Sequence, residues 1–166
     1  MLTLIIARHA EASVLSENGD HSRELSGRGL AQAVAAGETI KGWGFAPSLC
    51  VSSDARRAAQ TAELIAETCG ISQGCVVYTN RLYKSYTTQE LVELVASAVA
   101  KSREPDADCV VVVGHNPDVT YKADALSSEP LKASFPTAGV VALLFDVDEW
   151  SEVSARAGTI LRSSFF

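Results

Sequence analysis

Short apolar runs and longer segments of helical periodicity alternate along most of the chain. Continuous apolar runs at residues 2–7, 49–52, 75–78 and 109–113 predict strands buried on both faces. Apolar positions at helical spacing predict helices over residues 29–41, 57–69, 89–102 and 117–126. The last segments, at residues 140–146, 150–154 and 159–163, are expected to form a closing antiparallel set. This order of elements predicts an α/β three-layer sandwich, in which helices flank a mostly parallel central sheet.

The first predicted helix and the segment before it carry more specific expectations. Within residues 29–41, the apolar positions Leu30, Val34 and Gly37 fall at helical spacing, and the glycines at 42 and 44 are expected to end the helix. Residues 11–24 are polar and are expected to form a loop. No repeat, low-complexity tract or linker divides the chain, so we expect a single domain over residues 1–166.

Composition narrows the class of protein. The 166 residues are 47% hydrophobic and carry a formal net charge of −6, which suits a folded acidic domain rather than a disordered chain. No apolar run approaches the ~20 residues that a membrane helix needs. A pI near 5.0 disfavours nucleic acid as a partner. The amino terminus enters a strand-like run without a signal-peptide pattern, so we expect a cytoplasmic protein.

The scarce cysteines and histidines do not suggest a metal site. The cysteines form no C-x-x-C pair, and Cys50 and Cys109 lie in apolar runs, where a thiol is usually a small buried hydrophobe. We therefore expect reduced thiols. His9, His21 and His115 are scattered along the chain and do not readily supply a zinc ligand set. We expect neither a metal nor a cofactor.

The residues that follow the predicted strands carry the candidate chemistry. In an open α/β sheet, ligands bind beyond the carboxyl ends of the strands. Arg8 and His9 follow the first predicted strand, Arg57 lies shortly after the second, and His115 follows the strand at 109–113. The topology therefore predicts that two histidines, far apart in sequence, converge with arginines at one edge of the sheet.

Two histidines among arginines are typical of a phosphoryl-transfer site. A neutral imidazole can attack a phosphoryl group and form a phosphohistidine intermediate. Arginine suits the phosphoryl oxygens because its planar cation donates several hydrogen bonds to the charge that spreads over them. A second histidine can donate to the same oxygens when protonated, and a bound dianion would raise its pKa. This chemistry needs no metal.

Three motifs stand after the predicted strands: R-H-A at residues 8–10, S-S-D-A-R-R-A-A-Q-T-A at 52–62 and G-H-N-P at 114–117. In this order they resemble the motifs of the histidine phosphatase superfamily (phosphoglycerate mutase-like). The second motif selects Arg57 rather than Arg56. The resemblance covers nearly the entire chain and implies the phosphoglycerate mutase-like fold. The short length and the P-T-A-G segment at 136–139 are similar to the small bacterial phosphohistidine phosphatase branch.

The resemblance implies roles for five residues. His9 would be the nucleophile that becomes transiently phosphorylated. Arg8 and Arg57 would hold the phosphoryl oxygens, and His115 would complete the pocket and stabilise the transferred charge. Arg23 matches a branch arginine that also reaches the phosphate. The implied activity is that of a metal-independent phosphatase, acting on phosphohistidine in a protein.

Alternatives stay open at this point. A small-molecule phosphomonoesterase, a mutase of the same superfamily and a non-catalytic phosphate-binding protein would use the same pocket. Larger members of the superfamily use a glutamate from an inserted region as general acid, and nothing in this chain clearly matches it. An imidazole leaving group tolerates that difference. Asp54 and Lys84 depart from the branch pattern and put the specificity in question.

Other polar residues near the motifs have plainer interpretations. We expect His21 to be a surface residue of the polar loop and Arg56 to be a solvated residue at a helix start. Ser52 and Ser53 are expected to be turn or cap residues rather than nucleophiles, because no G-x-S-x-G surrounds them.

Overall fold

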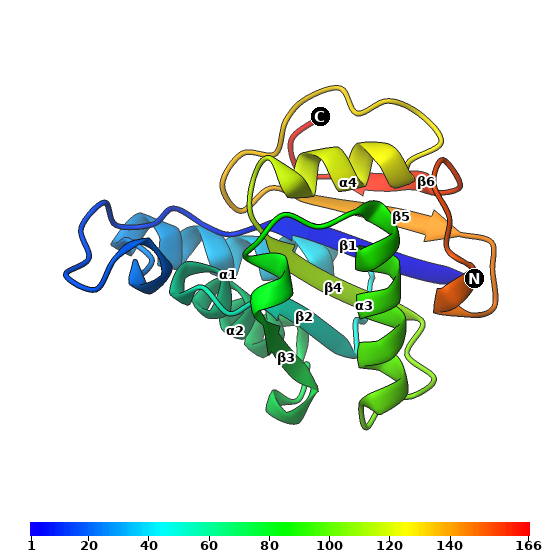
Figure 1. Ribbon diagram of the computed structural model, residues 1–166, viewed down its shortest axis with the longest axis horizontal. Coiled ribbons are helices and arrows are strands. Elements are labelled where there is room, and N and C mark those ends of the chain that lie inside the picture. The colour runs from blue at the N-terminus through cyan, green and yellow to red at the C-terminus, as the bar shows by residue number, and fades with distance from the viewer.

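A six-stranded mixed sheet forms the centre of the computed structural model, which describes all 166 residues (Figure 1). Its strands are β1 (Leu2–Arg8), β2 (Leu49–Ser53), β3 (Val76–Thr79), β4 (Cys109–Gly114), β5 (Val140–Phe145) and β6 (Thr159–Ser163). They lie in the order β3-β2-β4-β1-β5-β6. The first four in this order are parallel to one another, whereas β5 runs antiparallel to both β1 and β6.

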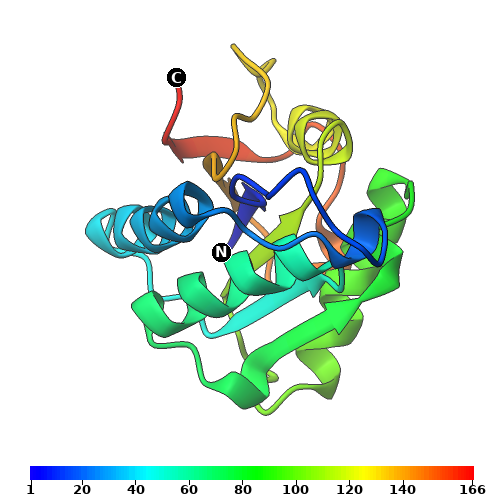
Figure 2. The ribbon, with the colours of Figure 1, turned by 90° about the vertical axis from the view of Figure 1, so that its left-hand side faces the viewer.

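Helices cover both faces of the sheet. They are α1 (Gly27–Gly42), α2 (Arg56–Cys69), α3 (Thr88–Lys101) and α4 (Asp118–Leu126). Figure 2 shows α1 and α2 together on one face and α3 and α4 on the other. The α/β three-layer sandwich with a mostly parallel sheet is therefore confirmed. No helix combines the length and the apolar character that crossing a membrane requires.

Local sequence signals explain where several helices begin and end. The side chain of Ser26 accepts a hydrogen bond from the backbone N–H of Gly29 and caps α1. Thr87 and Glu90 form a reciprocal capping box at the start of α3. Gly70 ends α2 in the left-handed conformation, with φ of 77°, which glycine adopts without a steric penalty.

The first predicted helix is present as α1, but the larger apolar residues that revealed it lie on its outer side. Leu30 and Val34 are 44% and 39% exposed. The buried face consists instead of small residues and one isoleucine: Gly29, Ala33, Ala36, Gly37 and Ile40. Small residues let α1 approach α2 closely, since a Cβ atom added at Gly37 would lie 2.7 Å from the Cβ of Thr68. Hydrophobic spacing found this helix but favoured its larger apolar residues, which lie on the outside.

The strand expected at residues 150–154 is wrong. Residues Trp150–Glu152 form a 3-10 turn, η4, between β5 and β6. The indole N–H of Trp150 donates to the carbonyl oxygen of Ala107 at 2.7 Å, and the ring is buried against the core. Glu149 and Glu152 cap the turn reciprocally. An anchored aromatic residue between polar neighbours gives the same short pattern as a strand.

The interior of the sheet is dominated by aliphatic residues. Every residue of β4 is buried, and one cluster of 40 buried residues joins the sheet to the helices on both faces. Cys50 and Cys109 are buried there, as expected, and all four cysteines are free thiols. Burial raises the pKa of both thiols to about 12, so they are protonated and inert at neutral pH.

Candidate active site

The parallel pairing of β1 and β4 brings the ends of the two motif-bearing strands side by side. Arg8 is paired with Gly114 in this register, and the backbone N–H of His9 donates to the Gly114 carbonyl at 3.0 Å. The next residues along each strand are therefore neighbours. The rings of His9 and His115 have centroids 5.1 Å apart and are tilted by 54°. Figure 2 looks onto this edge of the sheet, where β1 ends.

His9 is held as a neutral imidazole in one tautomer. Its Nδ1 lies 2.7 Å from the carbonyl oxygen of Ala10, and because a carbonyl only accepts, Nδ1 carries the proton. Burial lowers the pKa of His9 to about 4, and the positive charges of Arg57, Arg8 and Arg23 add to this effect. The Nε2 lone pair is therefore available at neutral pH.

His115 is positioned through the end of β2. Its Nε2 lies 2.8 Å from the hydroxyl oxygen of Ser53, and only 9% of the residue is exposed. Burial is the main cause that lowers the pKa of His115 to about 3, and the positive charge of protonated His9 contributes to this shift. A dianion bound beside the ring would oppose both effects.

Arg8 is oriented by the segment that precedes β5. Its Nη1 donates to the carbonyl oxygen of Phe135 at 3.0 Å, and the same oxygen accepts from Nδ2 of Asn116 at 2.8 Å. The hydroxyl of Thr120 donates to Oδ1 of Asn116 and accepts from the backbone N–H of Phe135. A closed set of hydrogen bonds therefore joins the G-H-N-P motif to the arginine of the R-H-A motif.

Arg57 enters the site from the first turn of α2. Its guanidinium is almost fully buried, and the hydroxyl of Thr61 donates to its carbonyl oxygen while accepting from the N–H of Ala10. Thr61, the threonine of the second motif, thus ties α2 to the loop after β1. Arg56 lies outside the site, where it pairs with Glu24 and Glu63 at the surface. The structure therefore separates the two adjacent arginines as the motif predicts.

Three buried nitrogen atoms in the site have no hydrogen-bond partner within the protein. They are Nε of Arg8, Nε of Arg57 and Nδ1 of His115, and no other buried side-chain nitrogen or oxygen atom of the chain shares this property. Unpaired buried polar atoms are costly, and native proteins keep few of them. Their concentration at one place, on the predicted phosphoryl-binding residues, fits an oxyanion with several acceptor oxygens.

Arg23 reaches the same region from the polar loop. Its Nε donates to Oδ1 of Asp20 at 3.0 Å, and its Nη1 donates to the carbonyl of Ser13. Asp20 belongs to the 3-10 turn η1 (Asp20–Ser22) and also accepts from Nη2 of Arg57 and from the hydroxyl of Tyr83. The hydrogen bond from Tyr83 lowers the pKa of Asp20 to about 2, with further contributions from Arg23 and Arg57. Asp20 and Tyr83 were not among the residues expected in the site.

His21 lies at the surface of the polar loop, as expected, and it also contacts residues beside the site. It is partly exposed, but its Nε2 lies 2.9 Å from Oδ1 of Asp54, and its ring meets the edge of Tyr83 at 4.8 Å between centroids. Tyr83 in turn contacts His115, with ring centroids 5.6 Å apart. We call Asp20, His21, Asp54 and Tyr83 the rim of the site. Lys84 is exposed, and its ammonium group makes no hydrogen bond to the rim.

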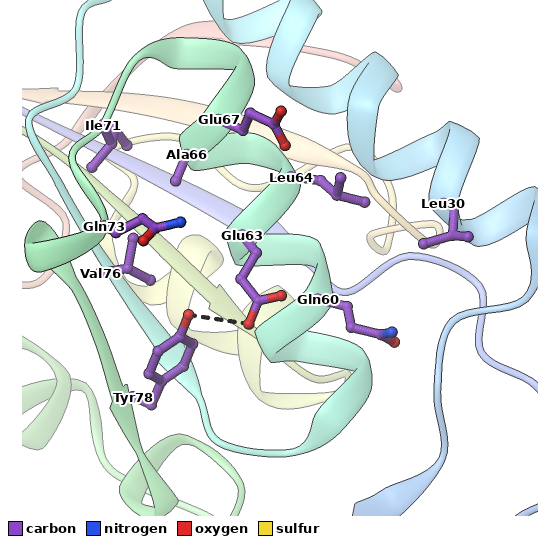
Figure 3. A pocket seen from close by; sticks show the side chains of 10 residues that line it. All are labelled: Leu30, Gln60, Glu63, Leu64, Ala66, Glu67, Ile71, Gln73, Val76 and Tyr78. Carbon is purple, nitrogen blue, oxygen red and sulfur yellow. Dashed lines mark hydrogen bonds between the residues drawn. The ribbon is translucent and has the colours of Figure 1, made fainter.

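A large hollow lies away from these residues. It has a volume of about 810 Å³ between α1, α2 and β3, and Figure 3 shows the side chains that line it. The Tyr78 hydroxyl donates to Oε1 of Glu63 inside it, at 3.3 Å. Burial and the nearby Glu63 carboxylate raise the pKa of Tyr78 to about 12. None of the predicted site residues lines this hollow.

Comparisons with known proteins agree with this fold. Residues 4–83 match the family model "histidine phosphatase superfamily (branch 1)". The protein histidine phosphatase SixA in complex with tungstate has a TM-score of 0.80 at 18% identity, over 98% of this chain and 96% of that one. The putative phosphohistidine phosphatase SixA from Nakamurella multipartitia has a TM-score of 0.76 at 26% identity, over 98% and 94%.

Two further similar proteins are not named as phosphohistidine phosphatases. A mycobacterial glucosyl-3-phosphoglycerate phosphatase shares the fold, with a TM-score of 0.67 at 22% identity over 94% of this chain and 96% of that one. An uncharacterized chloroplastic protein of Arabidopsis thaliana is 29% identical over 159 residues, which are 93% of this chain and 72% of the relative.

Fold, motifs and site geometry define an α/β enzyme of the phosphoglycerate mutase-like class. The chain belongs to the histidine phosphatase superfamily, branch 1. It is a phosphatase of that superfamily, and the solved structures similar to it include SixA proteins and a sugar-phosphate phosphatase.

Proposed function

We propose that this protein dephosphorylates phosphohistidine in another protein, through a transient phosphohistidine on His9. The observation that carries the proposal is the tautomer of His9. The hydrogen bond from Nδ1 to Ala10 fixes the ring, and the lowered pKa keeps the Nε2 lone pair free. A buried, oriented and neutral imidazole beside two arginines has the properties of an activated nucleophile.

The reaction has two steps. In the first, Nε2 of His9 forms a bond to phosphorus while the bond from phosphorus to the imidazole nitrogen of the substrate breaks. The departing imidazole takes its proton from solvent. In the second step, water attacks phosphorus, phosphate leaves and neutral His9 is restored. Arg8 and Arg57 bind the non-bridging oxygens during both steps and supply positive charge where negative charge develops, and His115 completes the pocket beside them.

The Asp20 carboxylate is unsuited to protonate an oxygen leaving group. A general acid must be protonated at the working pH, and the low pKa of Asp20 leaves that carboxyl ionised. An alcohol leaving group needs a proton donor, whereas a phosphorylated imidazole can be protonated on its own ring before it departs. This difference favours phosphohistidine over a sugar phosphate. The relatives named as SixA phosphohistidine phosphatases point in the same direction.

We further propose that the reaction is metal-independent and takes place in the cytoplasm. Arg8, Arg57 and Arg23 supply the cationic groups that a metal would otherwise provide. Buried, protonated thiols at Cys50 and Cys109 suit a reducing compartment.

A substrate panel tests the proposed function. Purified protein is offered a phosphohistidine peptide, a sugar phosphate and 3-phosphoglycerate, each with and without a chelator, and phosphate release is measured. We expect the phosphohistidine peptide to have the highest kcat/KM, with no effect of the chelator. His9→Asn should reduce kcat by a factor of about 10³ or more, since the residue forms the covalent bond. Preference for the sugar phosphate would establish the alternative, a small-molecule phosphomonoesterase. Loss of activity with chelator would contradict the mechanism.

A further inference from the structure

Asp20 joins the residues that surround the phosphoryl pocket. Its Oδ2 accepts hydrogen bonds from Nη2 of Arg57 at 3.1 Å and from the Tyr83 hydroxyl at 2.8 Å. Its Oδ1 accepts from Nε of Arg23 at 3.0 Å, and its backbone carbonyl accepts from Nη1 of Arg57 at 2.9 Å. One residue therefore engages both terminal nitrogens of Arg57, which leaves the buried Nε of that arginine for the phosphoryl group.

The carboxylate of Asp20 lies between the buried pocket and solvent. The side chain of Asp20 is 54% exposed, whereas that of Arg57 is 7% exposed. On the other side of the carboxylate, Tyr83 packs its ring against His115. In-line displacement by a nucleophile on the buried side directs the leaving group away from it, toward the open side of the site. The leaving group of a bound substrate therefore departs past a fixed carboxylate.

The charges of the site balance a phosphoryl dianion and no more. Arg8, Arg23 and Arg57 are cationic, and the ionised Asp20 cancels one of their three charges. The two buried histidines add no charge at neutral pH, since burial lowers the pKa of His9 to about 4 and that of His115 to about 3. Two positive charges remain for the two negative charges of the phosphoryl group, so a further anionic group on the substrate would lie uncompensated beside a carboxylate.

We infer that Asp20 is a specificity-determining residue, which disfavours substrates whose leaving group is anionic and favours those whose leaving group is neutral or cationic. This role rests on the proposed phosphatase function and deepens it. It predicts that phosphorylated carboxylic acids, such as phosphoglycerates, are poor substrates because the Asp20 carboxylate repels their own carboxylate. A protonated phosphoimidazole carries its positive charge toward the same carboxylate and gains from it.

The rim offers a matched control for the charge of Asp20. Asp54 is a second partly exposed rim carboxylate, with 38% of its side chain accessible, but its hydrogen bond goes to His21 and not to an arginine of the pocket. Asp54→Asn removes the same unit of charge from the same side of the molecule. It leaves the contacts of Arg23 and Arg57 unchanged.

The test compares three aryl phosphates that differ only in the charge of a para substituent: aminomethyl, hydrogen and carboxylate. The measured quantity is the ratio of kcat/KM for the aminomethyl substrate to that for the carboxylate substrate. We expect Asp20→Asn to lower this ratio by about tenfold, because a unit charge about 6 Å away in a water-like dielectric changes kcat/KM by about threefold, and in opposite directions for the two charged substrates. Asp54→Asn should lower it by no more than about threefold, since the Asp54 carboxylate contacts His21 and no arginine of the pocket.

The ratio separates charge selection from looser positioning of the arginines. A change in the arginines affects all three substrates alike and leaves the ratio unaltered. An unchanged ratio in Asp20→Asn, with turnover that still depends on His9, would overturn the role of Asp20 while the proposed function stands. Turnover that does not depend on His9 would overturn the proposed mechanism instead. In that event, the dissociation constants of the aminomethyl and carboxylate phenylphosphonates are measured for both variants. The ratio of these two constants then decides the role of Asp20 without any turnover.

Discussion

At the residue scale, the proposed nucleophile depends on which nitrogen of His9 carries the proton. The carbonyl of Ala10, the next residue along the chain, fixes that proton on Nδ1. The second histidine is equally buried and is also neutral at neutral pH. Two neutral imidazoles among three arginines keep the pocket cationic without placing a charge on the nucleophile.

The buried histidines should make the protein less stable in weak acid. Both have a lower pKa in the folded protein than the ordinary value of 6.5, so the unfolded chain binds more protons as the pH falls from about 6.5 to about 4. The free energy of unfolding should therefore decrease over this interval, by up to about 3 kcal/mol for each histidine. Asp20 acts in a different interval, because its lowered pKa makes its stabilising contribution disappear only as the pH falls from 3.8 through about 2.

Urea denaturation between pH 4 and pH 8 measures this dependence. The comparison is between the wild-type protein and a variant that combines His9→Asn with His115→Asn. We expect the variant to lose much less stability than the wild type between pH 6.5 and pH 4, and the two slopes to agree above pH 7. Equal slopes over the acidic interval would show that the two imidazoles do not carry the effect.

At the element scale, the site depends on the close contact of α1 with α2. Gly29 and Gly37 lie on the contact face of α1, and a Cβ atom at Gly29 would lie 1.9 Å from the Glu11 carbonyl oxygen. Glu11 follows the R-H-A motif, and its N–H donates to Oε1 of Gln32 on α1. The packing of this helix therefore holds the loop that carries the nucleophile.

Substitution of Gly37 tests the contact between the two helices. A Cβ atom there would lie 2.7 Å from the Cβ of Thr68, so Gly37→Ala should push α1 away from α2 and lower the free energy of unfolding by about 1–3 kcal/mol. Gly42→Ala is the control, since it lies in the same helix with no atom within 4 Å of the added Cβ. We expect the control to be neutral or slightly stabilising in urea denaturation. Equal stability of the two variants would contradict a tight contact at Gly37.

The sequence predicted the buried strands more accurately than the contact face of α1 or the residues at the rim of the site. Buried parallel strands are continuous apolar runs, so β1 and β4 were located to within a residue. The residues at their ends could then be placed together, because parallel strands bring their carboxyl ends to one edge. The contact face of α1 was missed because glycine and alanine carry little hydrophobic signal. Tyr83 and Asp20 were missed because a hydrogen bond between residues 63 positions apart, both in short turns, leaves no periodic pattern.

At the scale of the whole molecule, net charge and local charge have opposite signs. The chain carries a formal charge of −6, yet its site gathers Arg8, Arg23 and Arg57 around two histidines. Sheet topology makes this possible, because three segments far apart in sequence meet where β1, β2 and β4 end. The acidic remainder of the surface would favour a phosphorylated partner with basic character.

The most direct test of the account is to trap the phosphorylated enzyme. The protein is mixed with a phosphohistidine peptide, quenched in alkali within the first turnover and examined by intact and peptide mass spectrometry. We expect one added phosphoryl group, labile in acid, on the peptide that contains His9, and none in His9→Asn. Turnover without such an adduct, or an adduct on another residue of an active His9→Asn variant, would contradict the proposed mechanism.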